Sequence, residues 1–470
     1  MKNPMHNYRP VIIGAGPAGL GAAAAFVEAG ITPVVIEETN YPGGQGTRRL
    51  SAAIENLGQT IFGASKYSKT QIRERLEDQV LSNCDLRTRT MAWAIYDNVI
   101  STSSDSEHDE VPYQHLLIAI GATDRIMAVE GWQLGGVYSL GGAQVALKTH
   151  GSAIGKKIIF AGSSPLLYLA AAQYARLGFR DLVILDSTSQ WHKYSAAFAM
   201  AYHSFNTLFE GLSLIRELKR YGVKIITGME LLRFEGKQYV EQVTYKDRNK
   251  NTHVIECDAV AYGYGLKSET QLAELAGAKF AFDTQFRQWF PQVSADGKAG
   301  SDLWLAGDST AIGGADAAAA SGRLAALSMM AAVGKQVDHK EMTRLRTKVR
   351  SLRSFQTAMT QAFRWPHEQA AKITDETYVC RCERVTAGEI RQAVQSHIAH
   401  SDVNRIKAIT RCGMGRCQGR YCNQTLQELA VSTSGKDPIL VGRLRAQAPF
   451  RPFAVGLGDE ALRKREQDHA

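Results

Sequence analysis

Five of the seven cysteines in this 470-residue chain lie close together in its last quarter. They form a C-x-C pair, a second pair separated by four residues, and one further thiol just before the second pair. No secretory signal is recognisable, and an intracellular chain seldom gathers cysteines to make structural disulfides. Thiolate metal or redox chemistry is therefore the better interpretation. The five residues are Cys380, Cys382, Cys412, Cys417 and Cys422.

The spacing of these cysteines favours an iron–sulfur cluster over zinc. Zinc ribbons usually place two residues between the cysteines of a pair, whereas the gaps here are one and four. Four thiolates are the ligand set of a [2Fe-2S] cluster, and nearby glycines would let backbone N–H groups reach the sulfurs. The spacing leaves one ligand open, because Cys412 could replace Cys422.

A glycine-rich turn near the N-terminus predicts a dinucleotide site. The sequence Gly14-Ala15-Gly16-Pro17-Ala18-Gly19 follows a buried strand at 9–13 and opens an Ala-rich helix. In G-x-G-x-x-G the first glycine makes the turn, the second admits the pyrophosphate and the third lets helix and strand pack. Glu37 ends the next strand, where a carboxylate accepts hydrogen bonds from ribose hydroxyls, and Glu38 follows it.

Two later segments favour FAD as the ligand of this turn. Strands at 115–120 and 303–306 end in Ala119-Ile120-Gly121 and in Gly307-Asp308. Both resemble signatures of the glutathione-reductase-like flavoproteins, in which the Gly-Asp carboxylate binds the ribityl chain. Gly43-Gly44-Gln45 matches the loop after the acidic residue in that family. The expected FAD site comprises Gly14, Gly16, Pro17, Ala18, Gly19, Glu37, Glu38, Gly44, Gln45, Ala119, Gly121, Gly307 and Asp308.

A second strand–turn–helix pattern begins at Lys156, but its turn reads Gly162-Ser163-Ser164-Pro165-Leu166-Leu167. Only the first glycine is kept, and Ser164 places a Cβ where a pyrophosphate would need bare backbone. Asp186 still ends the following strand. We expect a nested domain that keeps its fold and binds NAD weakly or not at all, with its cleft open to another nucleotide.

Several functions are disfavoured. No run of 18 apolar residues occurs, so no transmembrane helix is expected, and the expected compartment is the cytoplasm. The net charge of +9 has no nucleic-acid motif beside it, so a solvated helix face or a protein-docking surface explains it better. The first cysteine is Cys84, which argues against a redox-active disulfide beside the flavin.

The elements needed to position these groups predict an α/β chain with the two-dinucleotide-binding, glutathione-reductase-like fold and a small α-helical C-terminal [2Fe-2S] domain. A helix at 314–333 should direct its N-terminus at the flavin. The expected units are an FAD-binding domain in two parts, 1–122 and 257–335, a nested domain at 123–256, a linker at 336–373 broken near Pro366, a Cys-rich domain at 374–432 and a tail at 433–470 that packs along a surface or a partner.

The segments Cys380-Arg-Cys-Glu383 and Thr410–Cys422 resemble the BFD-like [2Fe-2S] domain. That domain ends the α subunits of octopine and nopaline oxidases, hydroxyproline dehydrogenases and hydrogen cyanide synthase. The resemblance covers nearly the whole chain, including the stretch 131–144. Because the family pairs its last two cysteines, it implies Cys380, Cys382, Cys417 and Cys422 as ligands.

The resemblance implies an electron-transferring α subunit of a hetero-oligomeric dehydrogenase. Such a complex oxidises the C–N bond of an amino acid, imino acid or opine and passes electrons to a quinone-type acceptor. A smaller FAD-containing β subunit carries the substrate site, and this chain shows no acid/base constellation of its own. The resemblance leaves open a small γ subunit, an FMN at a subunit interface and a peripheral place at the inner membrane. Alternatives are a stand-alone NAD(P)H-dependent flavin/[2Fe-2S] reductase and an iron-handling or docking protein.

Overall fold

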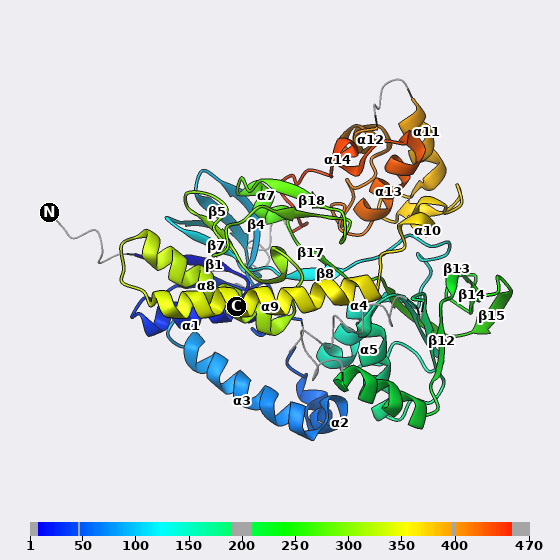
Figure 1. Cartoon of the computed structure of the whole chain (residues 1–470), viewed down its shortest axis with the longest axis horizontal. Coiled ribbons are helices and arrows are strands. Elements are labelled where there is room, and N and C mark those ends of the chain that lie inside the picture. Colours follow the sequence, from blue (N-terminus) through cyan, green and yellow to red (C-terminus); the bar gives the residue numbers. More distant parts are fainter. Residues whose placement is uncertain (1–7, 46–47, 190, 192–208, 397–400, 454–470) are drawn as a thin grey trace, which may run out of the picture.

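The structure, a computed structural model, describes residues 8–45, 48–189, 191, 209–396 and 401–453. Two five-stranded parallel sheets form the body of the molecule (Figure 1). The first has the order β20-β7-β1-β2-β3, and its three central strands are fully buried, as expected for strands covered on both faces. Its strands are β1 (Val11–Ile13), β2 (Val34–Ile36), β3 (Asp85–Arg87), β7 (Leu116–Ile118) and β20 (Leu303–Leu305).

Helices α1 (Pro17–Glu28) and α8 (Ala315–Ala332) pack together on this first sheet. Their contact is close because both helices are rich in Ala and Gly. A Cβ on Gly322 would lie 1.8 Å from the backbone oxygen of Ala18, so no side chain fits there. This packing places the N-terminal ends of α1 and α8 near the carboxyl ends of the strands, where ligands bind in such sheets.

The second sheet belongs to the nested domain and has the order β12-β11-β10-β16-β9. It corrects one predicted boundary. Strand β16 (Ala259–Gly263) pairs in parallel with β10 (Ile158–Gly162), so the nested domain extends past residue 256. Its other elements are β9 (Val137–Ser139), α4 (Leu140–His150), α5 (Pro165–Arg176), β11 (Leu182–Asp186), β12 (Lys224–Thr227), and an antiparallel sheet of β13 (Glu230–Glu235), β14 (Gln242–Lys246) and β15 (Thr252–Glu256).

A short antiparallel ribbon joins the two large domains. It consists of β8 (Ala122–Asp124) and β17 (Leu266–Ser268), the strands by which the chain enters and leaves the nested domain. The remaining elements decorate the first domain. They are η2 (Ala52–Leu57), α2 (Gly58–Phe62), α3 (Ala64–Leu81), the sheet of β4 (Met91–Tyr96), β5 (Val99–Ser103) and β6 (His108–Pro112), α7 (Gln271–Leu275), and the hairpin of β18 (Phe280–Asp283) and β19 (Gln288–Pro291).

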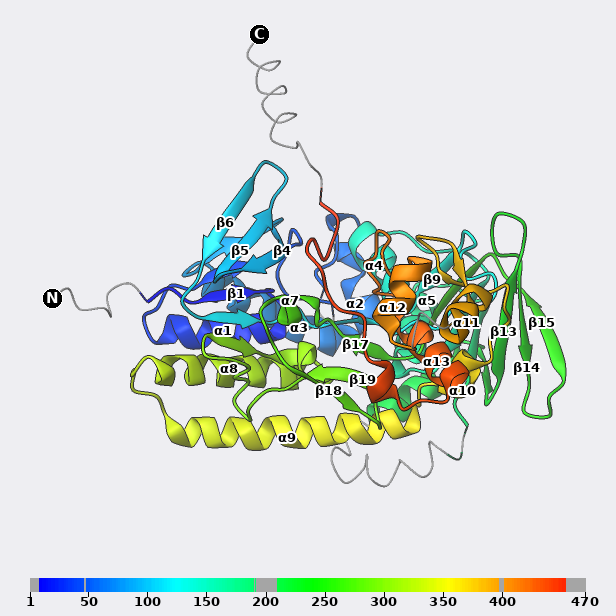
Figure 2. The ribbon, with the colours of Figure 1, turned by 90° about the horizontal axis from the view of Figure 1, so that it is seen from above.

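The predicted linker is mostly one long helix, α9 (His339–Ala362), which crosses the molecule from the first domain toward the Cys-rich domain (Figure 2). Asp338 caps its N-terminus by accepting hydrogen bonds from the N–H groups of Lys340 and Glu341. The helix ends before Pro366, and the short α10 (His367–Ala371) follows. Among the described helices, none is long and apolar enough to cross a membrane.

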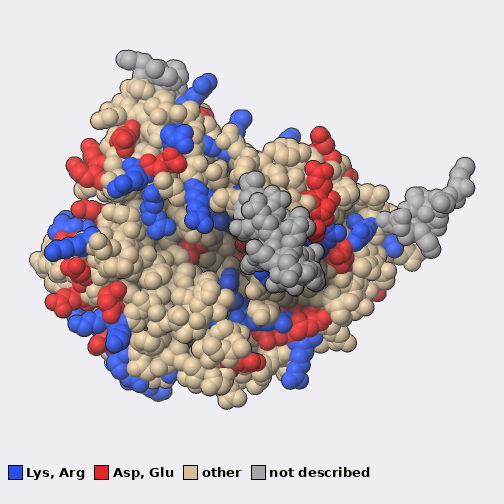
Figure 3. Space-filling model, turned by 180° about the vertical axis from the view of Figure 1, so that it is seen from behind, with Lys and Arg blue, Asp and Glu red and all other residues tan. Residues whose placement is uncertain are grey.

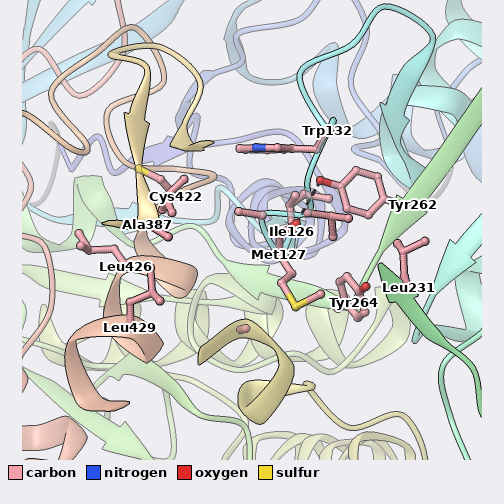
Figure 4. Close-up of a cluster of buried hydrophobic side chains, with 14 of the residues drawn as sticks. Ile126, Met127, Trp132, Leu231, Tyr262, Tyr264, Ala387, Cys422, Leu426 and Leu429 are labelled. Atoms are coloured by element: carbon pink, nitrogen blue, oxygen red, sulfur yellow. Dashed lines mark hydrogen bonds between the residues drawn. The ribbon is translucent and has the colours of Figure 1, made fainter. Parts of the chain in front are cut away.

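The Cys-rich domain shares a buried core with the nested domain. Figure 4 shows Leu426 and Leu429 of the Cys-rich domain on one side of this core, and Trp132 and Tyr262 on the other. The two domains therefore pack as one body. The elements of the Cys-rich domain are β21 (Tyr378–Cys380), β22 (Val385–Thr386), α11 (Ala387–Gln395), α12 (Val403–Thr410), α13 (Asn423–Ser434) and α14 (Pro438–Val441).

Within the predicted tail, which also contains α14, residues 442–453 return from the Cys-rich domain to the first domain (Figure 2). We call this segment the C-terminal strap. Arg443 pairs with Glu274 at 2.7 Å, the N–H of Phe450 donates to the oxygen of Trp93 at 3.2 Å, and Arg451 pairs with Glu38. The predicted packing along a surface holds for this segment, while residues 454–470 lie outside the described chain.

Candidate functional site

The first glycine turn leaves a gap that no side chain fills. Gly14 has a φ of +100°, and a Cβ there would lie 2.6 Å from the backbone oxygen of Ala119, so this glycine serves the fold. A Cβ on Gly16 would meet nothing closer than the Cα of Gly44, at 3.8 Å. Two bare backbone segments thus face each other at the N-terminus of α1. This cradle fits a pyrophosphate, which needs close backbone approach and helix N–H donors.

Glu37 is oriented at the edge of this cradle. Glu37 is 8% exposed as a residue, and its carboxylate accepts hydrogen bonds from the N–H of Ala15 at 2.8 Å and from the N–H and Oγ1 of Thr39 at 2.9 and 2.6 Å. Glu38 turns away and pairs with Arg451 of the C-terminal strap. Glu37, rather than Glu38, is therefore the carboxylate placed to meet a ribose.

Asp308 lies in the short turn Gly307–Ser309, which follows β20 and precedes the loop that leads into α8. Its Oδ1 accepts hydrogen bonds from the N–H groups of Gly313 and Gly314 at 2.8 and 3.1 Å. Burial raises the pKa of Asp308, and these two hydrogen bonds and the charge of Arg353 oppose the rise. Ser268 donates to the backbone oxygen of Asp308 at 2.5 Å. The aspartate is thus held close to the N-terminal end of α8, and its contact with FAD stays a prediction.

Arg353 is a site residue that the sequence did not reveal. It reaches from α9, and its Nη2 donates to Oγ1 of Thr310 at 2.6 Å. Its Nε is buried and finds no hydrogen-bond partner among the described residues. An unpartnered buried donor beside Asp308 fits a polar ligand, because such a donor otherwise costs about 1–3 kcal/mol. Its place in an Arg-rich polar helix gave no signal that this one arginine points inward.

All five C-terminal cysteines meet in one place. The Sγ atoms of Cys380, Cys412 and Cys422 all lie within 4.8 Å of one another, and these residues are 1%, 0% and 2% exposed. Cys417 contacts Cys422 and Cys382, and Cys382 is exposed. Hydrogen bonds from the Cys412 and Cys422 thiols lower the pKa of Cys380. Converging thiols of this kind fit a thiolate-held cluster.

Backbone donors surround the sulfurs. The N–H groups of Gly413 and Glu383 hydrogen-bond to Cys380, and that of Tyr421 to Cys417. Gly415 must be a glycine, because a Cβ there would lie 2.3 Å from the Cβ of Cys382. The loop 413–419 can therefore fold directly over the C-x-C turn, as its glycines suggested. Such N–H···S contacts tune the potential of a bound cluster.

A single segment, Lys267–Glu269, touches both candidate sites. The N–H of Glu269 donates to the oxygen of Gly121 at 3.0 Å, on the flavin side. Its carboxylate, 4% exposed, accepts from Arg420 of the Cys-rich domain at 3.0 Å. Burial would raise the pKa of Glu269, but Arg420 and Lys267 hold it below its usual value. This buried ion pair joins residues 151 positions apart, which no local pattern reveals.

The nested glycine turn is closed by its own side chains. Ser164 is 4% exposed and caps α5, its Oγ accepting from the N–H of Leu166 at 3.1 Å. Asp186 is fully buried, and the hydroxyl of Tyr168 donates to its Oδ2 at 2.6 Å. The N–H of Thr188 donates to Oδ1 of Asp186 at 2.8 Å. The acidic residue that could meet a ribose is thus engaged within the protein, and weak NAD binding stays a prediction.

The cysteines border an open hollow of about 380 Å³. Four arginines line it with Trp132, and the guanidinium of Arg381 lies 4.4 Å from the centre of the Trp132 ring. Lys and Arg side chains also gather around the hollowed centre of the face in Figure 3. The edge of the cysteine site is therefore accessible and positively charged. The four arginines are Arg381, Arg416, Arg420 and Arg451.

Comparison with known proteins agrees with this geometry. Residues 8–322 match the pyridine nucleotide-disulphide oxidoreductase family, and residues 378–430 match the BFD-like [2Fe-2S] binding domain. The A subunit of the opine oxidase from Rhizobium meliloti (strain 1021) is 32% identical over 95% of this chain and 97% of its own length. The corresponding opine oxidase protein of Agrobacterium tumefaciens (strain Ach5) is 30% identical over 95% and 90%, and the HcnB protein of hydrogen cyanide synthase from Pseudomonas aeruginosa is 28% identical over 97% and 100%.

Solved structures share the fold. The L-proline dehydrogenase from P. horikoshii superposes with a TM-score of 0.68 over 96% of this chain and 80% of that one, at 20% identity. The T. acidophilum thioredoxin reductase has a TM-score of 0.52 over 70% and 100%, at 19% identity. The chain is therefore an oxidoreductase that uses FAD and a [2Fe-2S] cluster. It belongs to the pyridine nucleotide-disulphide oxidoreductase family, carries a BFD-like domain in addition, and is similar to the A subunits of opine oxidases.

Proposed function

We propose that this chain is the electron-transferring subunit of a hetero-oligomeric dehydrogenase that oxidises the C–N bond of an amino acid, imino acid or opine. A smaller FAD-containing subunit carries the substrate site, and a quinone-type acceptor at the inner membrane takes the electrons. The names of the relatives support this proposal, since they include opine oxidase and hydrogen cyanide synthase subunits. The complex works in the cytoplasm, with this chain as a relay.

The observation that carries the proposal is the shared segment Lys267–Glu269. It hydrogen-bonds to Gly121 and Asp308 on the flavin side and to Arg420 on the cluster side. A buried, rigid connection of this kind fixes the separation of two sites, which electron transfer between them requires. A protein that only binds iron or docks a partner would not need the flavin site and the cysteine site to share one segment.

The chain's residues hold the groups and tune them. When bound, FAD exchanges electrons in pairs or singly and the [2Fe-2S] cluster exchanges single electrons, chemistry that no side chain supplies. We assign the cradle of Gly16 and Gly44, with Glu37 and Asp308, to FAD. We assign Cys380, Cys382, Cys417 and Cys422 to the cluster. The described residues supply binding, orientation and charge, and the C–N chemistry belongs to the partner.

The positively charged hollow fits the contact with that partner. Arg381 and Arg416 line it beside Cys382, which is exposed. An acidic surface on the smaller subunit would be attracted there, and charge complementarity of this kind speeds association and fixes orientation. We infer that electrons enter or leave the chain at this edge.

The test uses the chain produced and purified together with the smaller flavoprotein subunit that the proposal requires. Anaerobic addition of L-proline or an opine should reduce the flavin and then produce the EPR signal of a reduced cluster. The Cys380→Ser variant should lose that signal and keep the flavin reduction. If NADH reduces the isolated chain promptly and the C–N substrate does not, the chain is a reductase and the proposal is wrong.

A further inference from the structure

The cysteine site holds one thiol more than a cluster needs. A [2Fe-2S] cluster takes four thiolates, and five converge here. The remaining two cysteines of the chain, Cys84 and Cys257, are not among them. The additional thiol, Cys412, either only fills space or can bind iron.

The position of Cys412 is that of a ligand. Its Sγ lies within 4.8 Å of both Cys380 and Cys422. Two thiolates on one tetrahedral metal, with bonds of about 2.3 Å, lie about 3.8 Å apart. Cys412 is therefore within reach of an iron bound by either neighbour, and it is fully buried, whereas Cys417 is partly exposed.

The backbone fixes Cys412 in this position. Helix α12 ends at Thr410, and the next residue, Arg411, turns the chain inward with a φ of +64°. Arg411 also pairs with Glu383 of the C-x-C turn at 2.8 Å. The N–H of Cys412 donates to Oγ1 of Thr410 at 3.2 Å. The following Gly413 passes close to Gly419, since a Cβ on Gly413 would lie 3.6 Å from the Cα of Gly419. The Cys412 thiol is thus held on the buried side of the site by the backbone of residues 410–413.

Cys417 occupies the opposite, accessible side. It lies in the loop 413–419, lines the open hollow, and contacts Cys422 and Cys382. Cys422 contacts both Cys412 and Cys417. The two candidate ligands therefore flank the same neighbour, one from the core and one from the surface.

We propose that Cys412 and Cys417 are interchangeable ligands of the cluster, with Cys380, Cys382 and Cys422 as the three fixed ones. In the exchange, one iron–thiolate bond breaks as another forms. The incoming thiol gives up its proton, the departing thiolate takes one, and no electron is gained or lost. The buried thiol would keep the cluster ligated when the accessible one is oxidised or displaced. This inference rests on the proposed ligand assignment and is independent of the substrate.

The test compares alanine variants of the full-length chain, because alanine cannot coordinate iron. Cys412→Ala and Cys417→Ala should each retain about two irons and two labile sulfides per chain, and the double variant should retain none. The EPR g-values of reduced Cys417→Ala should differ from those of the wild type, since a different thiol binds. Cys257→Ala, another buried cysteine, is the matched control and should leave the spectrum unchanged.

Bound flavin distinguishes cluster loss from misfolding, because the double variant should keep its FAD. Complete cluster loss in either single variant that retains flavin would overturn the interchange. A double variant that keeps its iron would overturn it as well. The proposed relay would fail differently, through an intact cluster that no C–N substrate reduces.

Discussion

The two glycine turns of the chain occupy equivalent places in two parallel sheets, but the first turn faces bare backbone and the second is filled by its own side chains. At both, the first glycine is fixed by a neighbouring strand: a Cβ would lie 2.6 Å from Ala119 oxygen at Gly14 and 2.0 Å from Gly263 oxygen at Gly162. Beyond that point they diverge. Gly16 faces bare backbone, whereas Ser164 turns its hydroxyl onto its own helix. The first glycine therefore serves the fold in both units, and we propose that the second position serves a ligand only in the first unit.

The acidic residues repeat this contrast. Glu37 is 8% exposed at the edge of the first turn, whereas Asp186 is fully buried and accepts a hydrogen bond from Tyr168. In the nested domain, internal hydrogen bonds to Ser164 and Asp186 accompany the missing glycines. These bonds are consistent with the predicted weak binding of NAD.

The largest expected effect comes from filling the cradle of the first turn. Gly16→Val should weaken FAD binding by at least about a hundredfold, or roughly 3 kcal/mol, because branched methyl groups would occupy the space of the pyrophosphate. The visible flavin absorbance of the purified protein measures this. Gly16 has an extended φ of −77°, so the fold should tolerate the change. Ser164→Val is the matched control and should stay yellow; a yellow Gly16→Val protein would refute the assigned site.

The next largest effect is the loss of stability when the first glycine of either turn is replaced, and it should be equal for the two turns. Gly14→Ala and Gly162→Ala should each lower the free energy of unfolding by about 2–4 kcal/mol, through backbone strain and a clash with a carbonyl. Urea denaturation checks the values. Gly30→Ala has a similar φ of +70° but open space around its Cβ, so it should cost about 1 kcal/mol. If Gly162→Ala left the free energy of unfolding unchanged, the nested turn would be looser than its geometry indicates.

A smaller effect should follow from removing the hydrogen bond that Tyr168 donates to the buried Asp186 of the nested domain. Tyr168→Phe removes the hydroxyl that donates to Asp186, which should cost about 1.5–3 kcal/mol for a buried hydrogen bond to a carboxylate. Thermal unfolding of the flavin-loaded protein is the measurement. Tyr138→Phe, at a residue 39% exposed, should change stability little. Equal stability of Tyr168→Phe and wild type would contradict this role of the hydrogen bond.

The smallest effect concerns the cap of α5. Ser164→Ala should cost about 1 kcal/mol and Ser164→Gly only a few tenths, as is usual at N-caps. Neither variant should gain NADH oxidation, because Asp186 and Tyr168 remain in place. NADH turnover with a dye acceptor provides the readout, and a clear gain in Ser164→Gly would mean that one Cβ alone keeps the nucleotide out.

Much of the fold could be predicted from local patterns. The glycine turns, buried strands and cysteine spacing each reflect interactions between near neighbours. The boundary at 256 was misplaced because β16 reads as an ordinary buried strand, and only its pairing with β10 assigns it to the nested sheet. Arg353 and the Glu269–Arg420 pair depend on distant segments meeting, so sequence spacing could not reveal them.

The C-terminal strap has a mechanical consequence for this chain. The Cys-rich domain is held at both of its ends. Before it, Trp365 donates a hydrogen bond to Glu428 of α13 at 3.0 Å, and after it, Arg451 of the strap pairs with Glu38 of the first domain. An electron-carrying domain that is attached at one end only can move between its donor and its acceptor. A domain that is attached at both ends cannot make that movement. We therefore expect any electron donor or acceptor to bind at one fixed place on this surface, and the rate of electron transfer to depend on which partner binds there and for how long.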